Sequence, residues 1–207
     1  MLNLNPTSDA PPRVVRVPLF NMLAQRLQRG GRWVILDFGP AHAGTVAFCN
    51  RFRCRLEVAD LARDLGSLNE LDDPAEFARH AEAILPPPRG DPPDIVFCWD
   101  LLNYLRRPAL TALMDRVAAR ARAGAMIHAL IVYSAARMPA RPGAYQPVFD
   151  PDGVPDQETL LVRSPDAGDD RDAPRYTPDD LRRCLPAYRL DRGTMLSNGL
   201  QEFLFRL

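Results

Sequence analysis

The chain has 207 residues, 46% of them hydrophobic, and its 26 basic and 26 acidic residues give a formal net charge of zero. This length and composition predict one globular domain with a substantial core, and the neutral balance argues against a surface for nucleic acid. All 26 basic residues are Arg, which excludes a P-loop lysine and any lysine Schiff base.

The cysteines and histidines do not form a metal motif. No two of the four Cys residues make a CxxC pair, and the three His residues are scattered, so we expect reduced thiols and no metal site. No apolar run approaches the roughly 18 residues of a membrane span, and the N-terminus lacks a signal-peptide pattern. We therefore expect a cytoplasmic protein without a membrane partner; its oligomeric state is not predicted.

The N-terminal part predicts a flexible segment, a helix and a buried strand. Residues 1–18 are polar and contain several Pro residues, so we expect them to be flexible and to precede a single domain over 19–207. From Pro18 to Gly30, apolar residues recur at helical spacing, and glycine ends this helix. Residues 33–36 form an apolar run that predicts a buried strand.

A turn of small residues follows that strand. The strand ends at Asp37, the turn spans Gly39–Gly44, segment 45–52 predicts a helix, and segment 54–59 predicts a strand that ends at Asp60. Strand, small-residue turn, helix, strand and acid is the arrangement of a βαβ nucleotide-cofactor site. Small residues let the backbone approach a ligand closely, and the final carboxylate can accept both hydroxyls of a ribose.

The middle of the chain continues the alternation of helices and strands. The pattern predicts a helix over 74–85, a buried strand over 95–99, a helix from Pro108 to about Ala123 and a strand over 125–133. No convincing strand occurs between Asp60 and Asp94. The third strand of a regular sheet is therefore either short or replaced by segment 61–71.

Residues 135–174 are a Pro/Asp-rich insertion with one short strand predicted over 158–162. We expect this insertion either to cover the acceptor side of the site, leaving the cofactor side free, or to be disordered. A helix over 177–184 and strands over 188–195 and 200–207 follow it. The whole pattern predicts an α/β fold: a Rossmann-like, doubly wound, mostly parallel sheet with a C-terminal antiparallel hairpin.

Three stretches resemble a known family. Residues 35–39 (ILDFG) are an apolar strand that ends in an acid before a glycine turn, Asp60 closes the next strand, and residues 94–105 (DIVFCWDLLNYL) form a strand followed by a loop. Together with the terminal hairpin, they resemble the class I S-adenosylmethionine-dependent methyltransferases over about residues 19–207. The resemblance implies methyl transfer to an unidentified, small-molecule or protein acceptor, with a small molecule favoured.

The resemblance also implies site residues. The cofactor S-adenosylmethionine would be bound by Asp37, Gly39, Ala41, Gly44, Asp60 and Trp99. Asn103 and Tyr104 would face the substrate. Asp100 is a candidate base or substrate-orienting group, with a helix N-cap as its structural alternative, and core packing is the alternative for Trp99.

The turn departs from the family pattern Gly-x-Gly-x-Gly. Here the sequence is Gly39-Pro40-Ala41-His42-Ala43-Gly44, so two glycines are replaced by Ala, and each added Cβ is expected to weaken cofactor binding without abolishing it. Two alternatives stay open: a non-catalytic methyltransferase-like binding or assembly module, and an NAD-binding oxidoreductase that uses Glu57 or Asp60 as its ribose acid.

Four further residues carry structural expectations. We expect His42 to be a solvent-side loop residue and His128 to be a core histidine on its strand. Tyr145 and Arg141 lie in the insertion, where they could cover a substrate or serve only as loop residues.

Overall fold

The computed structural model describes residues 11–149, 155–163 and 170–207. Its centre is a six-stranded sheet in the order β10-β11-β5-β4-β2-β3. The strands are β2 (Val34–Asp37), β3 (Arg55–Val58), β4 (Ile95–Trp99), β5 (Met126–Val132), β10 (Arg189–Met195) and β11 (Leu200–Arg206). Neighbouring strands from β3 to β5 pair in parallel, whereas β11 is antiparallel to both β5 and β10. The predicted Rossmann-like sheet with an antiparallel C-terminal hairpin is confirmed.

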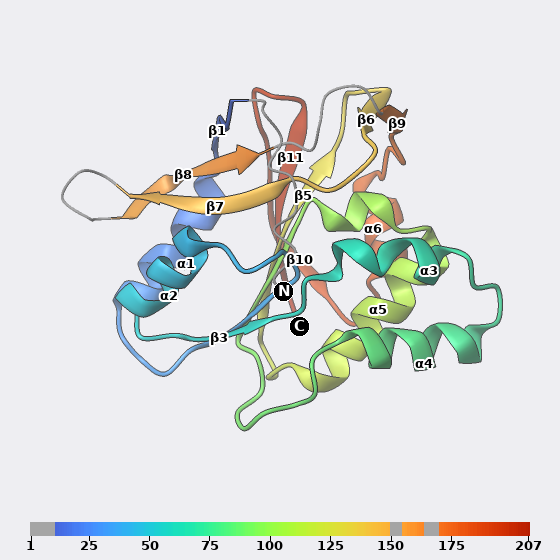
Figure 1. Cartoon of the computed structure of the whole chain (residues 1–207), viewed down its shortest axis with the longest axis horizontal. Helices are drawn as coiled ribbons and strands as arrows, with labels where there is room; N and C mark the ends of the chain where they lie inside the picture. Colours follow the sequence, from blue (N-terminus) through green and yellow to red (C-terminus); the bar gives the residue numbers. More distant parts are fainter. Residues whose placement is uncertain (1–10, 150–154, 164–169) are drawn as a thin grey trace, which may run out of the picture.

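Helices cover both faces of this sheet (Figure 1). On one side lie α1 (Pro18–Gln28) and α2 (Ala43–Arg51); on the other lie α3 (Leu65–Asn69), α4 (Pro74–Ile84), α5 (Arg107–Arg120) and α6 (Pro178–Cys184). Because both faces are covered, every residue of β4 and β5 is buried. Helix α2 leads from β2 outward to β3, and α5 leads from β4 outward to β5 on the opposite face. The order of strands therefore reverses between β2 and β4, and the crevice outside their carboxyl ends is where such sheets bind ligands.

The expected third strand is absent. All residues between β3 and β4 are described, and they form a short 3-10 helix, η1 (Leu61–Arg63), followed by α3 and α4. Of the two alternatives, replacement by segment 61–71 is the one observed. The free edge of β3 is instead approached by the loop before β4, where the carbonyl of Asp91 accepts a hydrogen bond from the Arg55 guanidinium.

The strand predicted over 158–162 is present within a longer strand, and the insertion forms further strands that were not predicted. Strands β1 (Arg13–Arg16), β8 (Pro155–Arg163) and β7 (Ala144–Phe149) make a separate sheet in the order β1-β8-β7, while β6 (Arg137–Pro139) pairs with β9 (Asp170–Asp172). Part of the segment that was expected to be flexible is thus strand β1, antiparallel to β8. Residues 1–10 lie outside the described residues. Because β1 and β8 are far apart in the sequence, no local pattern predicts that they pair.

A buried carboxylate ties the first helix to the last strand. Glu202 on β11 accepts hydrogen bonds from the backbone N–H groups of Leu19 (2.9 Å) and Phe20 (2.7 Å), at the start of α1. It also lies 2.8 Å from Nε2 of His128 on β5. Both Glu202 and His128 are fully buried, so the expected core position of His128 is confirmed. This contact supplies the helix start with the cap that its own sequence lacks.

None of the helices formed by the described residues reaches the length and apolarity needed to cross a membrane. The same residues contain no group of three or more His, Cys, Asp or Glu side chains that could hold a metal ion.

Candidate functional site

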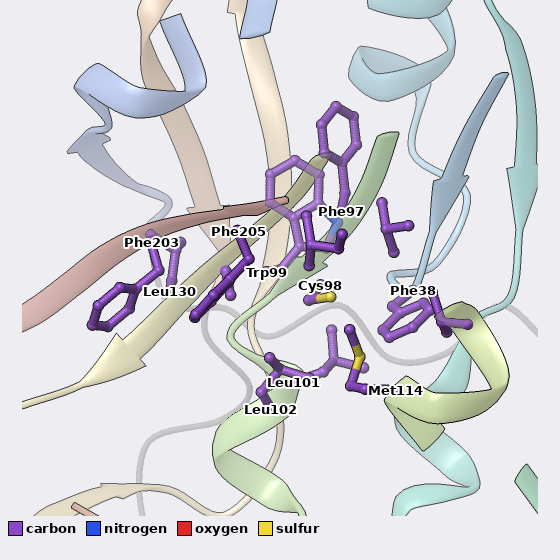
Figure 2. Packing of buried hydrophobic residues seen from close by; sticks show 14 of the residues in the cluster. Phe38, Phe97, Cys98, Trp99, Leu101, Leu102, Met114, Leu130, Phe203 and Phe205 are labelled. Carbon is purple, nitrogen blue, oxygen red and sulfur yellow. The ribbon is translucent and has the colours of Figure 1, made fainter. Parts of the chain in front are cut away.

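The side chain of Trp99 fills the crevice between the ends of β2 and β4. Its indole Nε1 donates a 2.5 Å hydrogen bond to Oδ1 of Asp37, which also accepts one from the backbone N–H of Gly39 at 2.8 Å. A Cβ built on Gly39 would lie 3.0 Å from Cδ1 of Trp99, so a larger residue would push the ring away by a few tenths of an ångström. Trp99 has a left-handed φ of 49° at a shift in register between β4 and β5. Figure 2 shows it beside Phe97, among the residues of the core.

Strand β7 closes this crevice from outside. The ring of Tyr145 stacks on Trp99, with centroids 5.8 Å apart and planes within 3° of parallel. The Tyr145 hydroxyl hydrogen bonds the carboxylate of Asp100, and the backbone N–H of Gly143 donates to Asp100 Oδ2 at 3.0 Å. Trp99 and Tyr145 are 1% and 6% exposed. Trp99 thus takes the core position that was the alternative to cofactor binding, as part of a buried aromatic stack.

The same strand lies against the turn and the start of α2. A Cβ built on Gly44 would lie 3.0 Å from both Gln146 Oε1 and the carbonyl oxygen of Pro147. In Figure 1, β7 crosses above α2 on the side of the sheet that holds α1. The expectation that the insertion covers only the acceptor side was wrong in this respect, because β7 contacts the turn assigned to the cofactor. The sequence pattern predicts the turn and the insertion separately, but it does not predict that they contact each other.

Asp60 and His42 form the outer rim of the site. Asp60 follows β3, is exposed and has a left-handed φ of 49°. The residues on either side of it donate backbone hydrogen bonds to the carbonyls of Asp37 (2.8 Å) and Phe38 (2.9 Å), which places Asp60 beside the turn. Burial lowers the pKa of His42, and the negative charge of Asp60 opposes this shift. His42 is the N-cap residue of α2 and half-buried, and its Nε2 has no hydrogen-bond partner among the described residues. His42 is thus less exposed than the expected loop residue.

Two buried carboxyl groups lie inside the rim. Burial raises the pKa of Asp37 to about 6, against the opposing hydrogen bonds from Gly39 and Trp99. Burial likewise raises the pKa of Asp100 to about 7, against the hydrogen bonds from Gly143 and Tyr145. Oδ1 of Asp100 is buried and has no partner among the described residues. A carboxyl group with a pKa near neutrality can take up and release a proton under ordinary conditions.

Asn103 and Tyr104 lie in the 3-10 helix η2 (Leu101–Tyr104), and their polar atoms bind the protein itself. The Asn103 amide donates to the carbonyls of Asp100 and Leu130, and its oxygen accepts from the backbone N–H of Val132 at 2.9 Å. The Tyr104 hydroxyl is 2.7 Å from the carbonyl oxygen of Arg141, in the insertion. In this conformation both residues join η2 to its surroundings, and their substrate-facing role stays a prediction.

The structure therefore places most of the predicted site residues in two neighbouring groups, while the polar atoms of Asn103 and Tyr104 bind the protein itself. Asp37, Gly39, Trp99 and Asp100 form an inner group, and Ala41 and Gly44 lie with Asp60 and His42 at the outer rim. Sequence reasoning singled out Tyr145 only as a residue that could cover a substrate, and missed its contacts with Trp99 and Asp100. The glycine at position 143 is a local feature that fits this packing, because a Cβ there would lie 3.0 Å from the Tyr145 ring.

Comparisons with known proteins support the fold. No protein-family model and no curated protein matches the chain. Among solved structures, the PH0226 protein from Pyrococcus horikoshii OT3 is 9% identical, with a TM-score of 0.51 over 91% of this chain and 88% of that chain. At this identity the likeness is one of fold.

Two further solved structures are named as methyltransferases. The 1,6-didemethyltoxoflavin-N1-methyltransferase of Burkholderia thailandensis is 16% identical, with a TM-score of 0.47 over 91% of this chain and 76% of that chain. A S-adenosylmethionine-dependent methyltransferase from Clostridium acetobutylicum ATCC 824 is 10% identical, with a TM-score of 0.47 over 91% and 89% of the two chains. These values are too low to carry an argument about function.

Proposed function

We propose that the chain is a S-adenosylmethionine-dependent methyltransferase that acts on a small-molecule acceptor. The observation that carries this proposal is the position of Asp37, the Gly39–Gly44 turn and Asp60 side by side at the carboxyl edge, where the strand order reverses. Asp60 is exposed after β3, where a carboxylate can accept the hydroxyls of a ribose.

The residues fit only part of this cofactor as they lie. The exposed rim suits an adenosine, because Ala41 and Asp60 are open to solvent beside the start of α2. The inner crevice does not suit the methionine end, because the indole of Trp99 lies on Gly39 and uses Asp37 Oδ1. The conformation described is therefore a closed one, and methyl transfer requires this crevice to open.

Asp100 is our candidate for the group that handles a proton of the acceptor. It lies directly after β4, and burial gives it a pKa of about 7. Its Oδ1 has no hydrogen-bond partner among the described residues, so this oxygen is free to accept a donor from a ligand. Methyl transfer otherwise requires an acceptor held in line in a dry pocket.

Ligand binding tests the proposal. The melting temperature of the purified protein is measured with S-adenosylmethionine, S-adenosylhomocysteine or NAD. A ligand at a hundredfold excess over its Kd adds about 2.7 kcal/mol to the free energy of unfolding. Stabilisation by an adenosyl ligand is expected; none at about millimolar concentration would contradict the proposal, and stabilisation by NAD alone would favour the oxidoreductase alternative.

Asp60→Ala tests the ribose contact. Loss of charge-assisted hydrogen bonds should weaken adenosyl-ligand binding by about 1.5–3 kcal/mol without unfolding the protein. Glu57→Ala is the matched control, because Glu57 lies on β3, three residues before Asp60, and pairs with Arg55 at 3.0 Å. Calorimetric titration of both variants measures the effect. If Glu57→Ala weakens binding and Asp60→Ala does not, the ribose acid has been assigned wrongly.

A second candidate function is a non-catalytic binding or assembly module. The filled crevice favours it, because Trp99 and Tyr145 leave no surface at Gly39 for a ligand in this conformation. A module of this kind would show no stabilisation by either adenosyl ligand in the binding experiment above.

A further inference from the structure

We propose that strand β7 and the Trp99 side chain form a displaceable plug: ligand enters the inner crevice only when β7 lifts from α2 and Trp99 turns away from Gly39. The plug is defined here as residues 143–147 together with Trp99. This inference rests on the proposed function, since it takes the inner crevice to be a ligand site.

The plug occupies the one place where the topology predicts a ligand. Trp99 lies on Gly39 and donates to Asp37, so the ring takes both the apolar surface and the acceptor that the crevice offers. Tyr145 covers the outer face of the ring and leaves it 1% exposed. A ligand that carries an N–H donor and lies flat on Gly39 would make the same contacts as the indole.

The attachment of β7 allows it to move as a unit. It is an edge strand of the small sheet β1-β8-β7 and makes its ladder with β8, not with the central six-stranded sheet. Towards the crevice, the contacts of the described residues 143–147 include the stack of Tyr145 on Trp99 and the hydrogen bond from the backbone N–H of Gly143 to the Asp100 carboxylate. Lifting β7 therefore leaves every ladder of the central sheet intact.

The closed position of the plug is locally unfavourable, which favours its opening. Asp100 is 8% exposed beneath the plug, and its Oδ1 has no partner among the described residues. A buried acceptor without a donor is unfavourable. Trp99 also adopts a left-handed backbone conformation, which a bulky residue holds only where its surroundings enforce it. Release of the plug lets Asp100 Oδ1 reach a donor, whereas the backbone of Trp99 stays paired with Ala129 in the central sheet.

A reversible disulfide can lock the plug in place. A Cβ built on Gly44 would lie 3.1 Å from Cβ of Gln146, close to the roughly 3.5–4.5 Å between the Cβ atoms of a disulfide. The double variant Gly44→Cys/Gln146→Cys is compared in its oxidised and reduced forms. Binding of S-adenosylhomocysteine is measured by calorimetry, with the wild type under the same two redox conditions as control.

The expected result is binding by the reduced form and at least a roughly hundredfold loss of affinity in the oxidised form, since affinity scales with the fraction of open molecules. Equal affinity in the two forms would overturn the plug and leave the proposed function standing. The reduced single variant Gly44→Cys shows whether the added Cβ itself weakens binding.

Tyr145→Ala provides a test that does not need binding by the wild type. Removing the stacked ring should tighten S-adenosylhomocysteine binding by about tenfold or more. It should also increase acrylamide quenching of Trp99 fluorescence in a Trp33→Phe background. Tyr133→Ala is the matched control, because Tyr133 is 47% exposed and lies outside the plug.

The two proposals fail in different ways. If the wild type does not bind but Tyr145→Ala does, the plug is supported and the wild type is a closed, inactive form. If no variant binds and Trp99 quenching does not change, both proposals are overturned. If wild type and Tyr145→Ala bind equally, with unchanged quenching, only the plug is overturned.

Discussion

Asp100→Asn should change how the stability of the protein depends on pH. The pKa of Asp100 is raised from 3.8 to about 7 because the carboxyl group is buried. One pKa unit corresponds to about 1.4 kcal/mol, so this difference is worth about 4 kcal/mol. The folded protein holds the proton more tightly than the unfolded chain does. The stabilisation is therefore complete below about pH 4 and is lost as pH rises towards and through 7.

The asparagine variant keeps the shape of the side chain but cannot ionise. Relative to Asp100→Asn, the free energy of unfolding of the wild type should fall by up to about 4 kcal/mol between pH 4 and pH 8. The variant should thus be the more stable protein at pH 8 and should lose that advantage at acidic pH. Asp37, with a pKa of about 6, adds a fall of the same sign to both proteins, so it cancels in the difference.

Urea unfolding at several pH values between 4 and 8, followed by tryptophan fluorescence, measures this difference. Asp72→Asn is the control, because the Asp72 side chain is 93% exposed and its pair with Arg106 should contribute little. Parallel pH profiles for the wild type and Asp100→Asn would refute the reasoning. That result would mean that Asp100 reaches solvent in the native protein and that β7 does not cover it.

Two further substitutions test the surroundings of the crevice. Glu202→Gln should destabilise the protein by about 2–3 kcal/mol, because a charged acceptor for the N–H groups of Leu19 and Phe20 is lost. Urea unfolding measures this change, and an unchanged midpoint would contradict the capping role. Gly39→Ala should lower the free energy of unfolding by about 1–3 kcal/mol and change the fluorescence of Trp99, since the added Cβ would lie 3.0 Å from the ring. An unperturbed emission spectrum would show that the ring does not lie on Gly39.

Most of the central fold could be predicted because its signals are local. Apolar runs precede Asp37 and Asp100 and indicate burial on both faces, and the strands that they form, β2 and β4, are buried throughout. The helix predicted at Thr177 begins there with a capping box in which the Thr177 and Asp180 side chains bind each other's backbone N–H groups. Signals of this kind depend on residues within a few positions of one another.

The parts that could not be predicted depend on distant partners. Strand β1 has only four residues, with Arg at both ends, and pairs with β8 about 145 positions further along the chain. The Pro and Asp content of the insertion indicates a loop, yet the insertion contributes strands β6, β7, β8 and β9, and β8 pairs with β1 and β7. The same holds for the site. Tyr145 belongs to no sequence motif, and its contacts with Trp99 and Asp100 depend on where β7 lies.

The filled crevice changes what the degenerate glycine turn means. The two Ala residues at positions 41 and 43 are exposed, so their Cβ atoms do not by themselves close the site. Closure comes from Trp99, a residue of the neighbouring strand, and from Tyr145 above it. These two side chains, and not the turn, separate Gly39 from solvent. Whether the chain is a methyltransferase or a binding module therefore depends on whether the Trp99–Tyr145 stack can move, and the number of glycines in the turn does not decide it.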